Sequence, residues 1–296
     1  MEQGALIGVD LGGTKVVAGL VIDNKPVKSS YKLIDSKNSN PQVVINEVIS
    51  VIEDLFNDEV VAIGIGIPGL VNRKEGIVSD VQNIPSWKEI RLKQILEDYF
   101  NVPVYLDNDA NCFALGEARY GAGRGENDFV GLTLGTGMGG GIIKNGFLLP
   151  DAHCGSGEFG NINYLDATYE DYCSGKFFKA RYGISGEKMA ALASQNDRVA
   201  LKAFEEFGTH LGNAITTVKL SVDPAKVIIG GSVANAAKYF ETSMWKTLLK
   251  FPFPEAMKDF EVIFSTVKNV AVLGAASLYL DKNEKVSVEK QVFENN

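Results

Sequence analysis

Apolar residues along this chain gather in short runs that alternate with glycine-rich turns and with stretches of helical periodicity. In the first half, the apolar runs predict strands at 5–10, 15–22, 27–33, 60–67 and 102–106. A 3.6-residue apolar period predicts helices at 41–56, 88–100 and 110–120.

The second half begins in the same way and then becomes more helical. A hairpin is expected over 129–134 and 139–144, and a polar, irregular region follows it at 151–175. Helices are predicted at 176–182, 186–194, 197–221, 235–250 and 270–280, and strands at 226–229 and 261–264. The polar tail, 281–296, is expected to be loose.

Both halves open with a glycine hairpin and continue into strand–helix units, without a sequence repeat of fixed period. This parallel predicts an α/β protein made of two related domains, with ligands in the cleft between them. We place the domains at 1–112 and 113–296, and allow the terminal helix, 270–281, to pack on the first of them.

Two glycine-rich turns are the main chemical signal. Asp10-Leu-Gly-Gly-Thr-Lys15 and Leu134-Gly-Thr-Gly-Met-Gly-Gly-Gly141 each join two apolar runs. Backbone N–H groups of a glycine turn can close on an anion, because no Cβ blocks the approach. Two such turns with neighbouring threonine hydroxyls indicate two sides of one polyphosphate, and therefore ATP and phosphoryl transfer. The alternative is two tight hairpins that hold no ligand.

Two familiar nucleotide motifs do not explain these glycines. The spacing Gly135-x-Gly137-x-x-Gly140 matches the dinucleotide fingerprint, but that motif must open a helix, and the following residues predict a strand and a turn. The P-loop pattern Gly-x-x-x-x-Gly-Lys-Ser/Thr does not occur in the sequence.

Composition narrows the kind of partner. The 296 residues carry 29 basic and 37 acidic side chains, a net charge of −8, which disfavours binding to nucleic acid or to an anionic membrane. No apolar run approaches the roughly 20 residues of a membrane span, and the first run lacks the basic flank of a signal peptide. Three cysteines in a chain of this length are typical of reduced thiols, so we expect a cytoplasmic protein.

The order and spacing of six motifs resemble the ROK family of sugar kinases and repressors, in the actin/hexokinase/Hsp70 superfamily. The motifs are Asp10-Leu-Gly-Gly-Thr-Lys, Gly66-Ile-Pro-Gly, Leu106-Asp-Asn-Asp-Ala-Asn111, Leu134-Gly-Thr-Gly-Met-Gly-Gly-Gly, His153-Cys-Gly-Ser-Gly-Glu-Phe-Gly160 and Ile228-Ile-Gly-Gly231. The resemblance runs from about residue 5 to residue 281. It implies two actin-like (ribonuclease H-like) α/β domains that flank a ligand cleft.

The resemblance further implies an ATP-dependent hexose kinase that uses Mg²⁺, with glucose as the favoured acceptor and a homodimer as the expected assembly. Kinases for N-acetylmannosamine, N-acetylglucosamine or fructose stay open as alternatives. A kinase that uses polyphosphate should carry a basic track, and none is evident. A sugar-responsive regulator is the alternative from another class. The phosphate motif begins at residue 10, so we expect no DNA-binding segment of the kind that the family's repressors carry.

A sugar hydroxyl needs a carboxylate to accept its proton as the phosphoryl group arrives, and by resemblance Asp109 is this general base. By resemblance, Asn108 binds a hydroxyl beside it. Asp109 could also cap a helix that starts at Ala110. A calcium loop is excluded, since the sixth position from Asp107 is Cys112 instead of glycine.

The resemblance assigns the remaining nucleotide-side residues. Asp10 would orient Mg²⁺ through water, and the backbone and side chains around the phosphates and adenosine would come from Gly12, Gly13, Thr14, Lys15, Gly135, Thr136, Gly137, Gly139, Gly230 and Gly231. Taken alone, the last pair is explained equally well by a close approach of a strand and a helix.

On the sugar side, the resemblance points to Glu158 and Glu170, whose carboxylates accept hydrogen bonds from hydroxyls, and we add Asn83. The family commonly carries a histidine three residues after the first glutamate, which contacts the sugar and joins three cysteines around a structural zinc. Here that position is Asn161, and the segment 162–169 contains no cysteine. The spacing of His153, Cys154 and Cys173 fits no tetrahedral site, so we expect no zinc.

Overall fold

The computed structural model describes residues 4–79, 81 and 83–294, which form two compact units. Unit 1 contains Met1–Asn127, Ile143–Ser156 and Val267–Asn296, and unit 2 contains Asp128–Ile142 and Gly157–Thr266. The boundary that we placed at residue 112 falls inside helix α3 (Asp109–Tyr120), and the chain leaves unit 1 only after that helix has ended.

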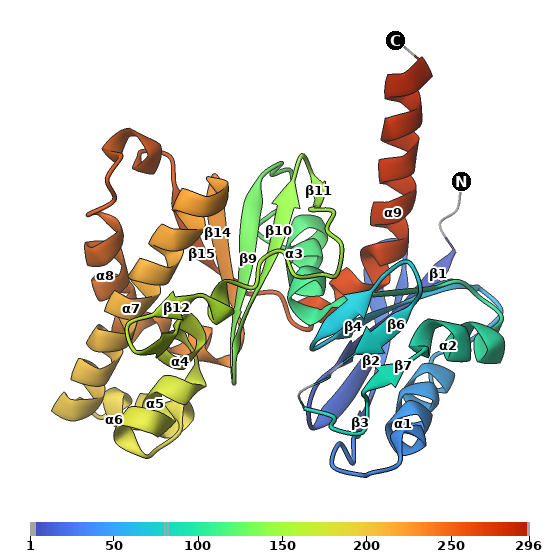
Figure 1. Cartoon of the computed structure of the whole chain (residues 1–296), viewed down its shortest axis with the longest axis horizontal. Coiled ribbons are helices and arrows are strands. Elements are labelled where there is room, and N and C mark those ends of the chain that lie inside the picture. The colour runs from blue at the N-terminus through green and yellow to red at the C-terminus, as the bar shows by residue number, and fades with distance from the viewer. Residues whose placement is uncertain (1–3, 80, 82, 295–296) are drawn as a thin grey trace. The chain divides into compact units, whose positions relative to one another are not determined.

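A five-stranded sheet forms the centre of unit 1, in the order β3-β2-β1-β4-β8 (Figure 1). The strands are β1 (Ala5–Leu11), β2 (Lys15–Ile22), β3 (Lys25–Leu33), β4 (Val60–Ile67) and β8 (Val104–Asn108). β1 pairs antiparallel with β2 and parallel with β4, and β4 pairs parallel with β8. The two parallel pairings bring the end of β1, at Asp10, and the end of β8, at Asn108, to the same edge of the sheet as the end of β4.

The helices of unit 1 are α1 (Pro41–Glu53), α2 (Leu92–Phe100), α3 and α9 (Val270–Glu294). A small sheet of β5 (Leu70–Asn72), β6 (Ile77–Ser79) and β7 (Glu89–Ile90) was not anticipated, and it takes residues that we assigned to the start of α2. The expectation of a loose tail from residue 281 is wrong, because α9 continues to Glu294 (Figure 1). The sequence after Gly274 has no glycine or proline to end the helix, and Arg119 on α3 holds Glu284 through two hydrogen bonds.

Helix α9 lies directly on β4 and α3. A Cβ at Gly64 in β4 would overlap the carbonyl oxygen of Ala275, and one at Gly274 would overlap the carbonyl oxygen of Cys112 in α3. Only glycine allows backbones to approach this closely. The packing therefore fixes α3, whose first residue is Asp109, against the sheet.

Unit 2 is built on β10 (Met138–Lys144), β9 (Phe129–Leu134), β14 (Lys226–Gly230) and β15 (Glu261–Phe264), neighbours in that order. β9 and β15 both pair parallel with β14. The last residues of β10 belong to unit 1, where they pair with β11 (Phe147–Leu148).

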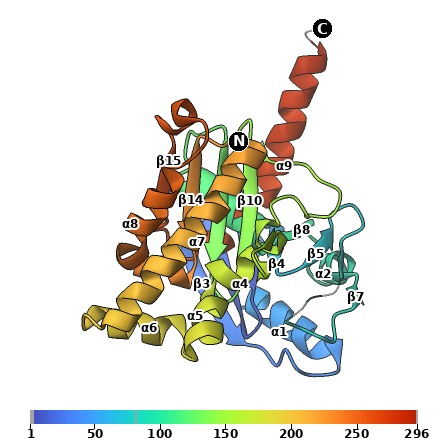
Figure 2. The same ribbon diagram turned by 60° about the vertical axis from the view of Figure 1, so that its left-hand side comes forward.

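The helices of unit 2 are α4 (Tyr169–Cys173), α5 (Gly175–Tyr182), α6 (Gly186–Ser194), α7 (Arg198–Val222) and α8 (Ala237–Leu248), with short 3₁₀ turns η1 (Phe159–Asn161), η2 (Ser232–Ala236) and η3 (Pro254–Met257). α7 and α8 lie side by side in Figure 1 and Figure 2. α4 and the hairpin of β12 (Asn163–Tyr164) and β13 (Ala167–Thr168) occupy the region that we expected to be irregular.

The predicted α/β class is confirmed, and both main sheets combine parallel and hairpin connections with helices. None of the helices that the described residues form has the length and apolar character needed to cross a bilayer.

Candidate active site

The first glycine turn connects β1 to β2 in unit 1. It is closed by a hydrogen bond from the Gly12 N–H to the carbonyl oxygen of Lys15, at 2.9 Å. A Cβ at Gly13 would lie 2.8 Å from the Cβ of Asn83, so the Asn83 side chain packs on this turn. The structure therefore brings the predicted sugar-side residue Asn83 to the predicted phosphate turn.

Asp10 and Asp109 interact electrostatically near this turn. The pKa of Asp10 is raised to about 6, mainly by burial and in addition by the charge of Asp109, while Lys15 opposes the shift. Burial also raises the pKa of Asp109, while a hydrogen bond from the backbone of Ala110 lowers it. Two desolvated carboxylates of like charge are stabilised by a cation. Carboxylate oxygen is the donor that Mg²⁺ prefers, so Asp10 fits the role of holding magnesium.

The loop between β8 and α3 presents Asp109. Asn108, not Asp109, is the N-cap of α3, and its Oδ1 accepts a hydrogen bond from the Ala110 N–H at 2.8 Å. Our alternative for Asp109 is thus corrected, because the helix starts one residue earlier than expected. The Asn108 amide also donates to the carbonyl oxygen of Gly69 at 3.3 Å, and Oδ1 of Asp109 accepts from the Ala110 N–H at 2.9 Å.

A network around Asp107 holds this loop. Asp107 is 3 % exposed, and its carboxylate accepts from the Arg73 Nε at 2.7 Å, the Arg73 Nη2 at 2.9 Å, the Asn111 Nδ2 at 2.8 Å and the Asn108 N–H at 2.8 Å. Two parallel bonds from arginine to a carboxylate are among the strongest hydrogen bonds in proteins. We had not singled out Arg73, because the partner of Asp107 is 34 residues away along the chain.

Arg73 also pairs with Asp151, in the segment that follows β11. Asp151 in turn accepts hydrogen bonds from the N–H groups of Cys154, at 3.0 Å, and Ser156, at 2.8 Å. The thiol of Cys154 donates to the carbonyl oxygen of Val71 at 3.3 Å. Arg73 therefore fastens both the loop before Asp109 and the segment 151–156 within unit 1.

The second glycine turn connects β9 to β10 in unit 2. The Gly135 N–H donates to the carbonyl oxygen of Gly137 at 3.0 Å, and the Ser174 hydroxyl donates to that of Thr136 at 3.1 Å. Glu170 accepts from the Met138 N–H at 3.0 Å. The structure thus places the Glu170 carboxylate against the phosphate turn, and its assignment to the sugar remains a prediction.

The other two sugar-side residues of unit 2 contact each other. Asn161 donates from Nδ2 to the Glu158 carboxylate at 2.7 Å, across the single turn of η1. A Cβ at Gly157 or Gly160 would overlap carbonyl oxygens of β10, so this segment lies on the strand that begins after the phosphate turn. Glu158, Asn161, Glu170 and the second turn are therefore gathered in one unit.

Gly230 and Gly231 lie at the end of β14. Gly231 has φ 88°, and a Cβ there would overlap the carbonyl oxygen of Leu134 on β9. Close backbone packing explains Gly231, and its predicted contact with adenosine remains untested.

The sequence profile of the ROK family matches residues 6–282. The chain belongs to the ROK family. It is 31% identical to a glucokinase of Thermotoga maritima, over 95% of this chain and 99% of the relative. It is 25% identical to a xylose repressor of Bacillus spizizenii, over 95% of this chain and 78% of the relative.

Among solved structures, the chain resembles a ROK family glucokinase from Streptomyces griseus in complex with glucose and AMPPNP. The TM-score is 0.79 and the identity is 27%, covering 93% of this chain and 99% of the other. This similarity agrees with the two-turn α/β architecture described above.

The hairpin of β12 and β13 lies where the resemblance led us to look for cysteines, and its Tyr164 contacts aromatic residues of α4 and α7. Tyr164 stacks on Tyr169 at 4.4 Å, and its hydroxyl contacts the Nδ1 of His210 on α7 at 3.1 Å. The Tyr169 hydroxyl bonds to that of Thr217 at 2.7 Å. Among the side chains that the structure describes, at residues 4–79, 81 and 83–288, no three histidine, cysteine or acidic side chains group as metal ligands would. The expectation that no zinc binds remains a prediction.

Arg73→Lys should weaken the Asp107 network, because lysine cannot make two parallel bonds to one carboxylate. We expect the free energy of unfolding to fall by about 1–3 kcal/mol, the usual cost of losing a hydrogen bond to a charged group, and kcat to fall at least tenfold. The matched control is Arg91→Lys, because Arg91 is exposed. If Arg73→Lys and Arg91→Lys have the same free energy of unfolding in urea and the same kcat, the role given to Arg73 is contradicted.

The coupling of Asp10 to Asp109 predicts a pH dependence. Because the pKa of folded Asp10, about 6, lies above its ordinary value of 3.8, ionisation of Asp10 lowers the free energy of unfolding as pH rises from about 4 to about 6. Asp109→Asn should lower the pKa of Asp10, and carboxyl-carbon NMR of the unliganded protein measures it. Asp58→Asn, at an exposed position, is the control. An Asp10 pKa near 4 in the unaltered protein would refute the coupling.

Proposed function

We propose that this ROK family protein is an ATP-dependent sugar kinase, with Asp109 as the general base and glucose as the favoured acceptor. The observation that carries the proposal is the setting of Asp109. Its carboxylate lies at the start of α3, where burial raises its pKa, and it interacts electrostatically with Asp10. The carboxylate of Asp107, two residues earlier, is hydrogen-bonded to Arg73 instead. The similarity to the Thermotoga maritima and Streptomyces griseus glucokinases supports it.

The reaction needs one proton acceptor and one phosphate cradle. Asp109 takes the proton from a sugar hydroxyl while the oxygen of that hydroxyl forms a bond to the γ-phosphorus of ATP. The bond from the γ-phosphorus to the β,γ-bridging oxygen breaks, and ADP is released. A raised pKa suits this role, because a base works best when its pKa lies near the working pH. Asn108, held by Gly69 and Ala110, would orient the hydroxyl.

The two glycine turns would bind the nucleotide. In unit 1, Asp10 would hold the magnesium ion, and Gly12, Gly13, Thr14 and Lys15 would contact phosphate oxygens. Magnesium, when bound, neutralises the charge of the phosphates. In unit 2, Gly135, Thr136, Gly137 and Gly139 would supply the second phosphate contact, and Gly230 and Gly231 the adenosine contact. A Cβ at Gly135 would meet no atom within 4 Å, so the space beside its Cα is open.

The choice of sugar would depend on Glu158, Asn161, Glu170 and Asn83. Asn161 donates a hydrogen bond to the Glu158 carboxylate. An amide would therefore orient this carboxylate toward the sugar, at a position where the family commonly carries a histidine. This change keeps N-acetylmannosamine, N-acetylglucosamine and fructose open as alternative acceptors. The similarity to a xylose repressor keeps a sugar-responsive regulator as the second candidate. The presence of Asp109 favours the kinase over the regulator, because a regulator needs no general base.

Asp109→Asn should preserve the shape of the site and abolish proton acceptance. We expect kcat to fall by roughly 10²–10⁴-fold, the usual contribution of general base catalysis, with little change in sugar affinity. A coupled assay of ADP release measures kcat, and calorimetric titration measures sugar affinity. Asp54→Asn, at an exposed position, is the matched control. A fall of less than about fivefold in the folded variant would show that Asp109 is not the base.

A further inference from the structure

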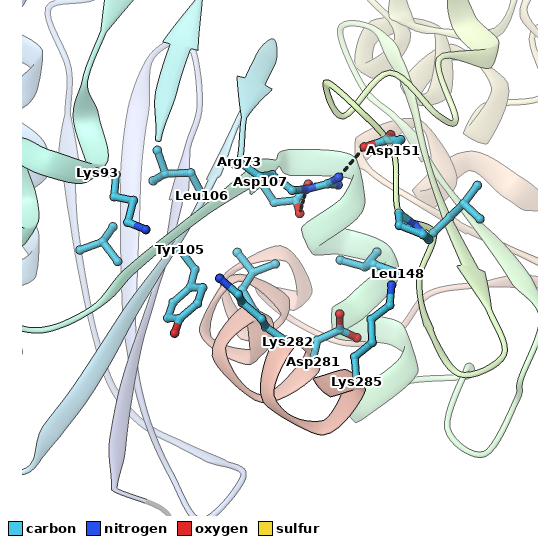
Figure 3. Close-up of a pocket in the computed structure, with 14 residues that line it drawn as sticks. Arg73, Lys93, Tyr105, Leu106, Asp107, Leu148, Asp151, Asp281, Lys282 and Lys285 are labelled. Atoms are coloured by element: carbon cyan, nitrogen blue, oxygen red, sulfur yellow. Dashed lines mark hydrogen bonds and ion pairs between the residues drawn. The ribbon is translucent and has the colours of Figure 1, made fainter. Parts of the chain in front are cut away.

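A separate cavity of about 260 Å³ opens within unit 1 (Figure 3). Its walls come from the free edge of β8, from α9, from the segment after β11, and from single residues next to β5 and on α2. Sites for drug-sized ligands are larger, about 300–1,000 Å³. The cavity therefore suits a compact metabolite and is too small for a nucleoside triphosphate.

Basic side chains slightly outnumber acidic ones in the wall of the cavity, where Asp107, Asp151 and Asp281 are the acidic members, although the protein as a whole is acidic. Arg73, Lys93, Lys282 and Lys285 line it, and the net charge of the chain is −8. Arg73 is committed to Asp107 and Asp151, and Lys93 forms a long ion pair with Glu97 at 3.8 Å, so Lys282 and Lys285 are the main cations left for a ligand. In the view of Figure 3, the side chains of Lys93 and Lys282 extend toward each other. Clustered ammonium groups in a concave wall attract an anion, and phosphate in particular.

One buried acceptor in the wall lacks a donor. Asp281 is 7 % exposed, and within the described part of the chain its Oδ1 has no hydrogen-bond partner. Burial raises the pKa of Asp281 to about 6, against the lowering effect of the Arg119 charge. A buried polar atom without a partner is destabilising, and a hydroxyl donor would satisfy it. The wall beside it is apolar, with Leu148 and Leu278, and the Tyr105 ring lies 5.3 Å from the Lys282 ammonium.

We propose that this cavity is a second ligand site, which takes a small phosphorylated sugar. The phosphate group lies against Lys93, Lys282 and Lys285, a sugar hydroxyl donates to Asp281, and the carbon face of the ring covers the leucines and Tyr105. Arg73 belongs to the same wall, so the occupant also touches the network that holds the loop before Asp109.

Calorimetric titration of the full chain tests this site. The probes are glucose 6-phosphate and inorganic phosphate, each added to protein saturated with glucose and AMPPNP, so that the sugar and nucleotide sites are filled. We expect one glucose 6-phosphate per chain under these conditions, bound at least tenfold more tightly than inorganic phosphate. The same titration of unliganded protein keeps the test valid if glucose and AMPPNP fail to bind, since the cavity does not depend on the proposed function.

The variant Lys282→Ala/Lys285→Ala should weaken glucose 6-phosphate at least tenfold. Lys25→Ala/Lys37→Ala removes the same charge from exposed positions of unit 1 and should leave the affinity unchanged. Thermal melts verify that both variants fold. The proposal is overturned if neither protein state binds glucose 6-phosphate, if inorganic phosphate binds equally well, or if both double variants weaken binding alike.

Discussion

The carboxylate of Asp107 is the group on which the candidate active site depends. It is buried, and a buried charge is stable only when it is paired and hydrogen-bonded. Both Arg73 bonds, the Asn111 amide and the Asn108 N–H meet this requirement. Two of the four donors belong to the loop and helix that present Asp109. The hydrogen bonds that satisfy the Asp107 carboxylate thus also fix the position of Asp109.

The two aspartates Asp107 and Asp109 have different surroundings. Asp107 is surrounded by donors, whereas Asp109 receives its bond from the Ala110 N–H while burial raises its pKa. A carboxylate that is desolvated and sparsely bonded is ready to accept a proton. Helix α9 makes the arrangement rigid, because its backbone contacts β4 and α3 at glycines. The terminal helix of the chain therefore stabilises a loop that lies about 160 residues earlier in sequence.

Local patterns in the sequence predicted most of the strands and helices. β4 and β15 have the bounds that their apolar runs predicted, and both glycine hairpins form. The glycine turns were identifiable because their chemistry is contiguous. Arg73, Asp151 and His210 were not, since each acts through a partner distant in sequence. α9 continues beyond residue 281 because no glycine or proline ends it, and its contact with α3 through Arg119 and Glu284 is one that no local pattern reveals.

The two units contribute different chemistry. Unit 1 holds Asp10, Asp109 and the Arg73 network, and unit 2 holds the second turn with Glu158, Asn161 and Glu170. Each set is organised within its own unit by hydrogen bonds and close backbone contacts.

The most direct test is the rate of ADP release by the unaltered protein, with magnesium and ATP, across glucose, mannose, N-acetylmannosamine, N-acetylglucosamine and fructose. The account predicts one sugar phosphate for each ADP, negligible ADP without sugar, and the highest kcat/KM for glucose. ADP release that does not depend on sugar, or no turnover with any of these sugars, would contradict it.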